Sequence, residues 1–214
     1  MSTVAAFPDQ PIKLYRYVRS GHSHRVELFL SLLQLPYALV EVNLPANAHK
    51  QPAFLALNPF GQVPVIQDGA ITVADSNAIL VYLATQYDTG SWLPRDPVGA
   101  ASVQRWLSVA AGALAFGPAA ARRAALSKAP CPAEEAIARA HDLLTVMEAE
   151  LNATSFLTGN TPTLADIAHY TYIAHAPEGN VSLEPYPQLR RWLQRIETLP
   201  GFVPMVKTKV GLAS

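Results

Sequence analysis

One segment decides the fold of this chain: Ile12-Lys-Leu-Tyr-Arg-Tyr-Val-Arg-Ser-Gly-His-Ser-His-Arg-Val26. Its first part, 12–17, alternates with period two, which is typical of a strand with one buried face. Ser20-Gly-His-Ser23 interrupts this alternation, and apolar residues then recur at helical spacing and stop before Pro36. The segment therefore predicts a strand, a turn and a helix in direct succession.

The rest of the first half continues to alternate between strands and helices. The sequence predicts strands at 37–43, 63–67 and 70–73, and helices at 51–57 and 76–87. Asp68-Gly69 suits a type I′ turn, so the last two strands are expected to form an antiparallel hairpin. The first two strands flank a helix and are expected to be parallel, with a right-handed crossover. The resulting order, β-α-β-α-β-β-α, is that of a thioredoxin-like domain.

The second half predicts helices only. An Ala-rich helical run covers 98–127, with a kink expected at Gly117-Pro118. Thr163-Leu-Ala-Asp166 is a variant of the capping box and predicts the start of a helix. Further helices are expected from Pro132, at 188–199, and as a short element opened by Pro200-Gly201.

The chain length leaves room for two small domains, because 214 residues exceed the roughly 150 residues of an average domain. The fold class is therefore predicted as α/β followed by all-α. We expect a thioredoxin-like domain at 1–88, a linker at 89–97 and a helical bundle domain at 98–214.

Composition excludes several classes of protein. Lys and Arg number 16, as do Asp and Glu, so no basic excess indicates a nucleic-acid-binding surface. No stretch is typical of a signal peptide or a membrane span. Cys131 is the only cysteine, so neither an internal disulfide nor a cysteine-based zinc site is expected. The sequence predicts a cytoplasmic protein without nucleic-acid, membrane or metal partners.

The turn Ser20-Gly-His-Ser23 lies where thioredoxin-like redox proteins carry Cys-x-x-Cys. Serine occupies both cysteine positions, so no dithiol can operate from this turn. A hydroxyl at a helix N-terminus can instead donate to a thiolate that arrives with a ligand, which lowers the pKa of that thiol. The alternative is that Ser20 or Ser23 only caps the helix.

Two further pairs are candidates for contact with an extended, peptide-like ligand. A cis bond at Val63-Pro64 would turn the Val63 backbone toward such a ligand, although an ordinary trans proline at a strand start is the commoner case. Asp75-Ser76 begins a helix, where the hydroxyl and free amides suit a carboxylate and Asp75 suits an ammonium group. A simple N-cap is the alternative for this pair.

The order and spacing of these motifs resemble those of cytosolic glutathione S-transferases. The similarity to their N-terminal domain lies in Ser20-Gly-His-Ser-His-Arg-Val26, Leu35-Pro-Tyr37, Asn58-Pro-Phe-Gly-Gln-Val-Pro-Val65 and Ala74-Asp-Ser-Asn-Ala-Ile79. The similarity to their helical domain lies in Pro162-Thr-Leu-Ala-Asp166, Tyr186-Pro-Gln-Leu-Arg-Arg-Trp192 and Leu199-Pro-Gly-Phe202. The chain most resembles bacterial members with a Ser-Gly-Asn-Ser turn, and more distantly the zeta class.

The resemblance implies that glutathione is the cosubstrate, and it implies roles at the glutathione thiol. Ser20 matches the serine whose hydroxyl stabilises the thiolate, and Ser23 is the nearby substitute. His22 stands where related bacterial enzymes often carry asparagine, a second donor to the sulfur. Because other families use a tyrosine from the first strand, Tyr17, and less so Tyr15, is the alternative donor; packing in the sheet is the other role open to Tyr17.

The resemblance also implies contacts along the rest of glutathione. Val63, before the family's cis-proline at Pro64, would pair its backbone with the cysteinyl unit. Asp75 and Ser76 match the acidic-Ser pair that holds the γ-glutamyl head group. The expected contacts to the glycyl end are Lys50 and Gln62.

The resemblance places the electrophile pocket on the first long helix of the second half. Trp106, Phe116 and Arg122 lie on that helix, and Tyr17 is a further candidate for the pocket. Core packing is the alternative for Trp106. No catalytic or metal-binding role is expected of the residues outside these motifs. Cys131 is one of these, and surface or interdomain packing is expected of His169 and His175. Within the motifs, His22 and His24 are not expected to bind a metal, because no third ligand accompanies them.

These expectations combine into a glutathione transferase that activates the glutathione thiol for attack on a small apolar electrophile. A homodimer is expected because the surface is neutral and lightly charged. The role implied is detoxification. A glutathione-dependent disulfide reductase or peroxidase, and a non-catalytic ligand-binding protein on the same fold, remain alternatives. An isomerase of the zeta type is disfavoured, because its Ser-Ser-Cys turn is replaced here by Ser20-Gly-His22.

Overall fold

The computed structural model describes residues 7–127 and 133–213. The chain forms two compact units: Met1–Leu93 with Leu199–Met205, and Pro94–Thr198 with Val206–Ser214. The structure thus assigns a late segment of the chain to the first unit, which the division at 88 and 98 did not anticipate. Cys131 and the expected helix start at Pro132 lie outside the described residues.

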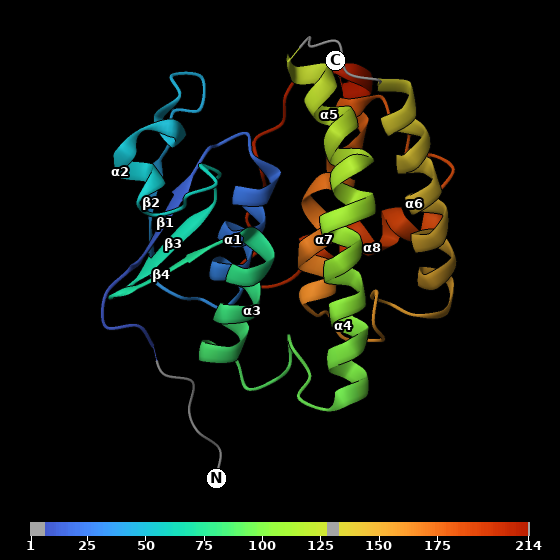
Figure 1. Cartoon of the computed structure of the whole chain (residues 1–214). Coiled ribbons are helices and arrows are strands. Elements are labelled where there is room, and N and C mark those ends of the chain that lie inside the picture. The colour runs from blue at the N-terminus through green and yellow to red at the C-terminus, as the bar shows by residue number, and fades with distance from the viewer. Residues whose placement is uncertain (1–6, 128–132, 214) are drawn as a thin grey trace. The chain divides into compact units, whose positions relative to one another are not determined.

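The first unit is a mixed four-stranded sheet with helices, in the order β2-β1-β3-β4 (Figure 1). Strand β1 pairs in parallel with β2 and antiparallel with β3, and β3 pairs antiparallel with β4. The thioredoxin-like prediction is therefore confirmed. The elements are β1 (Ile12–Arg16), α1 (Gly21–Leu32), β2 (Tyr37–Glu41), the 3₁₀ turn η1 (Ala48–Lys50), α2 (Pro52–Leu55), β3 (Val65–Asp68), β4 (Ile71–Ala74) and α3 (Ser76–Tyr87).

The alternation in β1 produces the expected burial: Ile12 and Leu14 are buried and Lys13 between them is exposed. Helices α1 and α3 pack against each other, while α2 lies apart from them (Figure 1). A small apolar cluster of Val42, Phe54 and Val65 connects α2 to the sheet. The sheet and its helices thus bring the start of α1 close to the start of α3.

The position of α3 is fixed by two tyrosines that bind the β3–β4 hairpin. The hydroxyl groups of Tyr82 and Tyr87 donate to Asp68 Oδ2 at 2.8 and 2.5 Å. Burial, and then the hydrogen bond to Asp68, raise the pKa of Tyr82 to about 12. Both tyrosines therefore remain protonated donors at neutral pH.

The segment Leu199–Met205 packs on α1 through hydrogen bonds. Ser31 Oγ donates to the Gly201 carbonyl at 2.6 Å, and His24 Nε2 lies 2.9 Å from the Val203 carbonyl. The expected short helix after Pro200-Gly201 is wrong: 202–210 contains no helix, and only the 3₁₀ turn η4 (Gly211–Ala213) follows. Contacts with α1, which is distant in the sequence, determine the conformation of this segment.

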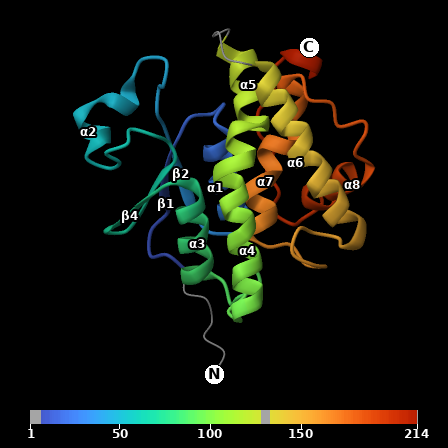
Figure 2. The same cartoon turned by 45° about the vertical axis from the view of Figure 1, so that its right-hand side comes forward.

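The second unit is built from helices, with one isolated β-bridge between Phe156 and Gly159 among its described residues (Figure 2). Helix α7 lies at its centre and contacts α4, α5 and α8. The prediction of a helical second half is confirmed. Its elements are α4 (Pro97–Val109), the π-helical turn η2 (Ala110–Leu114), α5 (Pro118–Ser127), α6 (Ala133–Ala153), α7 (Leu164–Ala174), the 3₁₀ turn η3 (Ala176–Gly179) and α8 (Pro187–Glu197).

The predicted break at Gly117-Pro118 separates α5 from the preceding helical turns. A Cβ on Gly117 would lie 2.8 Å from the Ala113 carbonyl oxygen and 3.0 Å from the Ala140 amide. Position 117 therefore requires glycine, because the backbone of α6 approaches closely at this break. None of the helices in 7–127 and 133–213 is long and apolar enough to cross a membrane.

Candidate functional site: two helix N-termini in the first unit

Ser20 is the N-cap of α1. Its backbone is extended, with φ −86° and ψ 117°, and its Oγ accepts a hydrogen bond from the Ser23 amide at 3.2 Å. Ser23 Oγ in turn accepts one from the Tyr17 amide at 3.3 Å. The two serines hold the turn so that the first amides of α1, which have no partner within the helix, lie at its positive end.

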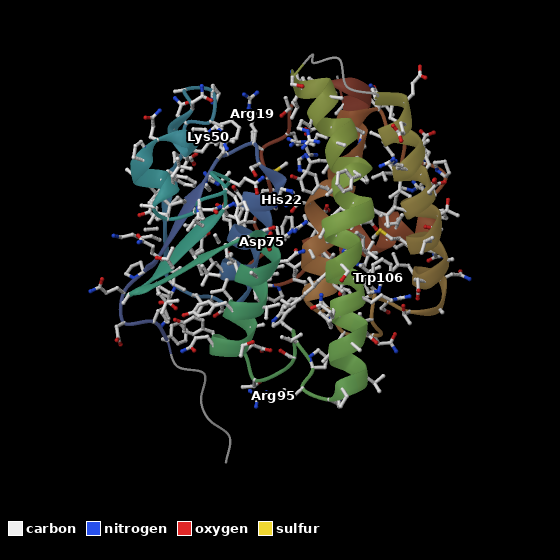
Figure 3. The ribbon with its side chains drawn as sticks, in the orientation of Figure 1. Arg19, His22, Lys50, Asp75, Arg95 and Trp106 are labelled. Carbon is white, nitrogen blue, oxygen red and sulfur yellow. The ribbon has the colours of Figure 1, made fainter. Side chains whose placement is uncertain are left out.

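His22 connects this turn to the start of α3. Its Nδ1 shares a 3.3 Å hydrogen bond with Ser76 Oγ, in which the tautomer of the ring decides which group donates. Figure 3 shows the labelled His22 and Asp75 close together. The predicted donor to sulfur therefore also contacts the predicted head-group site.

Asp75 is the N-cap of α3, and its carboxylate accepts from the amides of Asn77 and Ala78 at 2.9 and 3.0 Å. Its φ of 75° lies in the left-handed region, which costs a residue with a side chain about 1–3 kcal/mol. The Asp75 side chain is exposed, whereas Ser76 is buried. The first turn of α3 thus presents a carboxylate, a hydroxyl and helix amides.

Arg25 is part of this arrangement, and it was not among the residues predicted from the sequence. This side chain of α1 is 1% exposed, and its Nη1 donates to Ser76 Oγ at 3.0 Å and to Asn77 Oδ1 at 2.7 Å. The available signal was a charged residue four positions before Phe29, on the face of α1 that packs into the core.

The loop before β3 carries the other predicted glutathione contacts. The Val63–Pro64 bond is cis, as the resemblance implies and against the commoner trans form. Lys50 Nζ donates to the carbonyls of Phe60 and Gly61, each at 3.2 Å, which fixes its ammonium group beside Gln62. The carbonyl of Gln62 accepts a hydrogen bond from the Asn58 amide group at 2.8 Å, while the Gln62 residue is exposed.

The two tyrosines considered as alternative donors are both engaged in the first unit. Tyr17 lies just beyond the end of β1, and its hydroxyl oxygen accepts from Arg19 Nε and Nη2 at 3.0 and 2.7 Å. Tyr15 lies within β1 and donates to Gln67 Oε1 at 2.7 Å. Tyr17 therefore does not pack as a sheet residue, and Tyr15 does.

Trp106 and Phe116 meet at an apolar groove of about 460 Å³ in the second unit, between the α4–η2 region and α6. Trp106 is 2% exposed and lies edge-on to the His169 ring, so it also fills the core. Phe116 is 60% exposed at the same groove. The remaining lining residues are Arg105, Val109, Gly112, Ala113, Arg139, Asp142, Leu143 and Val146.

Arg122 does not line this groove, and the surface position expected of two histidines is wrong. Arg122 Nε donates to Glu178 Oε2 at 2.7 Å in a buried ion pair. His175 Nδ1 lies 2.7 Å from Glu178 Oε1, and His169 is fully buried with Nδ1 2.8 Å from the Ala165 carbonyl. Both histidines are buried: His169 lies on α7, nearly all of whose residues are buried, and His175 is the C-cap of this helix.

The pKa values of Glu178 and His175 follow from their burial and their hydrogen-bond partners. Burial alone would raise the pKa of Glu178, but hydrogen bonds from the Thr208 amide, His175 and Arg122 lower it below its usual value. Burial lowers the pKa of His175, which favours the neutral ring. The described part of the chain holds no group of three or more His, Cys, Asp or Glu side chains placed to bind a metal ion.

The fold and the site define a class of protein. A thioredoxin-like unit brings two helix N-termini together, carries serine where redox members of the fold have cysteine, and is joined to an all-helical unit. Such an arrangement suits a ligand that supplies its own thiol and carboxylate.

Comparison with known proteins identifies the family. Models of the glutathione S-transferase N-terminal and C-terminal domains match residues 19–86 and 113–200. Glutathione S-transferase F13 of Arabidopsis thaliana is 35% identical over 90% of this chain and 93% of its own length. The chain belongs to the glutathione S-transferase family, whose enzymes use glutathione as cosubstrate.

Other relatives carry different activities in their names. Maleylpyruvate isomerase of Ralstonia sp is 33% identical over 84% of this chain and 89% of its own length. The disulfide-bond oxidoreductase YfcG of Escherichia coli is 28% identical over 89% of this chain and 92% of its own. The names of these relatives alone therefore do not define the reaction of this chain.

Solved structures agree with the family. A glutathione S-transferase from Pseudomonas fluorescens has a TM-score of 0.87 and 33% identity, covering 92% of this chain and all of its own. A glutathione transferase homologue from Drosophila mojavensis, solved with bound glutathione, has a TM-score of 0.81 and 30% identity, covering 89% of each chain. The fold of the chain is thus that of glutathione S-transferases.

Proposed function

We propose that this chain is a glutathione transferase that activates the glutathione thiol at Ser20 and directs it at a small apolar electrophile. The observation that carries the proposal is the hydrogen bond between His22 and Ser76, which joins the N-termini of α1 and α3. One ligand of the length of glutathione can then contact both, with its thiol at α1 and its γ-glutamyl group at α3.

Thiol activation would be electrostatic. Ser20 Oγ accepts from the Ser23 amide, so its own proton remains available for donation to a sulfur anion. The positive end of α1 stabilises the same anion, and together they lower the pKa of a thiol from about 8.5. The thiol proton leaves to solvent, and the thiolate attacks the electrophile as its leaving group departs. His22 and Ser23 would support this anion as neighbouring donors.

The rest of glutathione would extend away from the sulfur along the same unit. Asp75 would hold the ammonium and Ser76 the carboxylate of the γ-glutamyl group, at the start of α3. Val63, next to the cis-proline Pro64, would pair with the cysteinyl backbone. The glycyl end would lie near Lys50 and Gln62, on the loop that Lys50 fixes.

The groove at Phe116 and Trp106 supports an apolar electrophile, because exposed aromatic surface with few polar groups favours such ligands. Tyr17, a residue of the first unit, stays a predicted contact to the electrophile. A homodimer is supported by the zero net charge and the 15% of charged residues. We place the activity, detoxification of such compounds, in the cytoplasm, and the single cysteine supports this location.

Two measurements test the proposal. Calorimetry should detect glutathione binding at submillimolar to millimolar concentration, and no binding would favour a non-catalytic protein with another ligand. A paired assay with glutathione should then give higher turnover for an aryl halide than for hydroxyethyl disulfide. The reverse order would make the chain a glutathione-dependent disulfide reductase.

A pair of variants tests whether the groove at Phe116 binds the electrophile. Phe116→Ala should raise KM for the aryl halide while leaving KM for glutathione unchanged. Val98→Ala is the matched variant, since Val98 is an exposed apolar residue of α4 that does not line the groove, and it should change neither.

A further inference from the structure

Arg25 places a positive charge inside the first unit. Its side chain is 1% exposed, although arginine is among the residues that are rarely buried unless they are well hydrogen-bonded. Its guanidinium stays protonated at every pH at which proteins fold. The charge is therefore permanent, and its burial reduces screening by salt.

The contacts of this guanidinium reach from α1 to the first turn of α3. Nη1 donates to Ser76 Oγ at 3.0 Å and to Asn77 Oδ1 at 2.7 Å. Ser76 and Asn77 are the first two residues of α3. One rigid group therefore sets the position of the Ser76 hydroxyl relative to α1.

The hydrogen bond from Arg25 Nη1 also determines whether the Ser76 hydroxyl can donate to another group. A hydroxyl has one proton and two lone pairs, and a guanidinium can only donate. Ser76 Oγ must therefore accept from Arg25 and keep its proton for another group. That proton is available to His22 Nδ1, at 3.3 Å, or to a carboxylate bound at the start of α3.

The positive charge of Arg25, like the hydroxyl proton of Ser76, favours a carboxylate at the start of α3. A cation in contact with the first two residues of α3 adds to the positive end of the helix and favours a bound anion. Asp75, the exposed carboxylate of this turn, has the opposite preference and suits an ammonium group. The two charges thus distinguish the two ends of an α-amino acid head group.

We propose that Arg25 is a positioning residue for the carboxylate of the γ-glutamyl group, acting through Ser76. This inference rests on the proposed glutathione function. Arg25 does not touch the ligand: it orients the Ser76 hydroxyl as a donor and supplies the buried charge that makes this site selective for a carboxylate.

The test compares two peptides that differ only in that carboxylate: glutathione and 4-aminobutyryl-cysteinyl-glycine. Calorimetry on the full chain gives both dissociation constants for the wild type and for Arg25→Gln. The variant is expected to bind glutathione about 10-fold to 100-fold more weakly, the range for loss of hydrogen bonds to a charged group. Its affinity for the truncated peptide should change by less than about twofold.

Two further variants keep the test valid if Arg25→Gln does not fold. Arg25→Lys keeps the positive charge but lacks the planar guanidinium that contacts both Ser76 Oγ and Asn77 Oδ1. It should therefore bind glutathione more tightly than Arg25→Gln and more weakly than the wild type. Asn77→Ala leaves the buried arginine in place and should weaken binding of glutathione several-fold without changing that of the truncated peptide.

Arg16→Gln is the matched control, because Arg16 is a partly buried arginine of the same unit whose partners are Glu27 and Glu41. It should leave both affinities unchanged. An equal loss for both peptides in Arg25→Gln, or no loss for either, would overturn the role of Arg25 while the proposed function stands. Failure of the wild type to bind glutathione would instead overturn the proposed function.

Discussion

Helices α1 and α7 both begin at a hydroxyl residue, but the hydrogen-bond partners at their N-termini differ. At α7, Asp166 accepts from the amides of Leu157 and Thr163 at 3.0 and 2.8 Å and from Trp192 Nε1 at 2.8 Å, and it is 0% exposed. At α1, Ser20 makes one cap bond, and the turn faces Ser76 through His22.

The difference lies in how completely each helix start is capped by groups of the chain itself. The N-terminus of α7 is completed by a capping box whose acceptors belong to the chain itself. At α1 and α3 the caps are single residues, Ser20 and Asp75, and the remaining amides can receive an anion from a ligand. A substitution at α7 should therefore affect stability, and one at α1 or α3 should affect binding or turnover.

The largest effect is expected at the buried carboxylate of α7. Asp166→Ala leaves two backbone amides and the indole of Trp192 without an acceptor, and should lower the free energy of unfolding by about 3–5 kcal/mol in urea titrations. Asp96→Ala is the control: Asp96 caps α4 from an exposed position and its loss should cost only about 1 kcal/mol. Equal losses would contradict the role assigned to α7.

Exchange of the two hydroxyl caps for alanine sharpens the comparison. Ser20→Ala should lower transferase turnover about 100-fold, the usual effect of removing a donor to a developing anion, while glutathione still binds. Thr163→Ala should lower stability by about 1 kcal/mol and leave turnover unchanged. Unchanged turnover in Ser20→Ala together with loss in Tyr17→Phe would move thiol activation from α1 to Tyr17.

A smaller effect is expected at the cap of α3. Asp75→Asn keeps an oxygen for the amides of Asn77 and Ala78, so the free energy of unfolding should change by less than about 0.5 kcal/mol. Loss of the charge should weaken glutathione binding about 10-fold. Calorimetry with glutaryl-cysteinyl-glycine, which lacks only the ammonium group, should give equal affinities for the variant and the wild type.

The smallest effect concerns the pH dependence of the second unit. The pKa values of His175 and Glu178 are both lower in the folded chain than their ordinary values of 6.5 and 4.5. Their contribution to stability is therefore present above those values and is lost as the pH falls through the lower folded values.

Thermal unfolding measured from pH 7.5 to 5 should show this decline in the wild type. In His175→Gln the decline should be shallower, because the group that binds a proton on unfolding is absent. A decline of the same size in both would show that other groups carry the pH dependence.

Local patterns predicted much of the fold and of the site. The alternation at 12–17 and the helical spacing after Ser23 predicted β1 and α1, because periodicity reports which face of an element is buried. Thr163 and Asp166 predicted the capping box of α7, since its partners lie three residues apart. The motifs also named His22 and Ser76 as candidate site residues, and the structure places Ser76 Oγ 3.3 Å from His22 Nδ1.

What could not be predicted depends on contacts between distant segments. Arg25 meets Ser76 across 51 positions of sequence, and Arg122 meets Glu178 across 56. The segment after Leu199 lies on α1 instead of forming a helix, because Ser31 and His24 hold its carbonyls. Burial of His169 likewise followed from the contacts of α7 with α4, α5 and α8, which its own sequence does not reveal.

The sequence by itself determined the order of strands and helices, the serine pair in place of a dithiol, and the family. These depend on periodicity and residue identity, which are local properties. Only the tertiary structure decided that His22 and Arg25 of α1 would meet the first turn of α3. The physical reason is that the packing of two helices on one sheet sets which polar groups share a buried space, and a buried charge requires such partners.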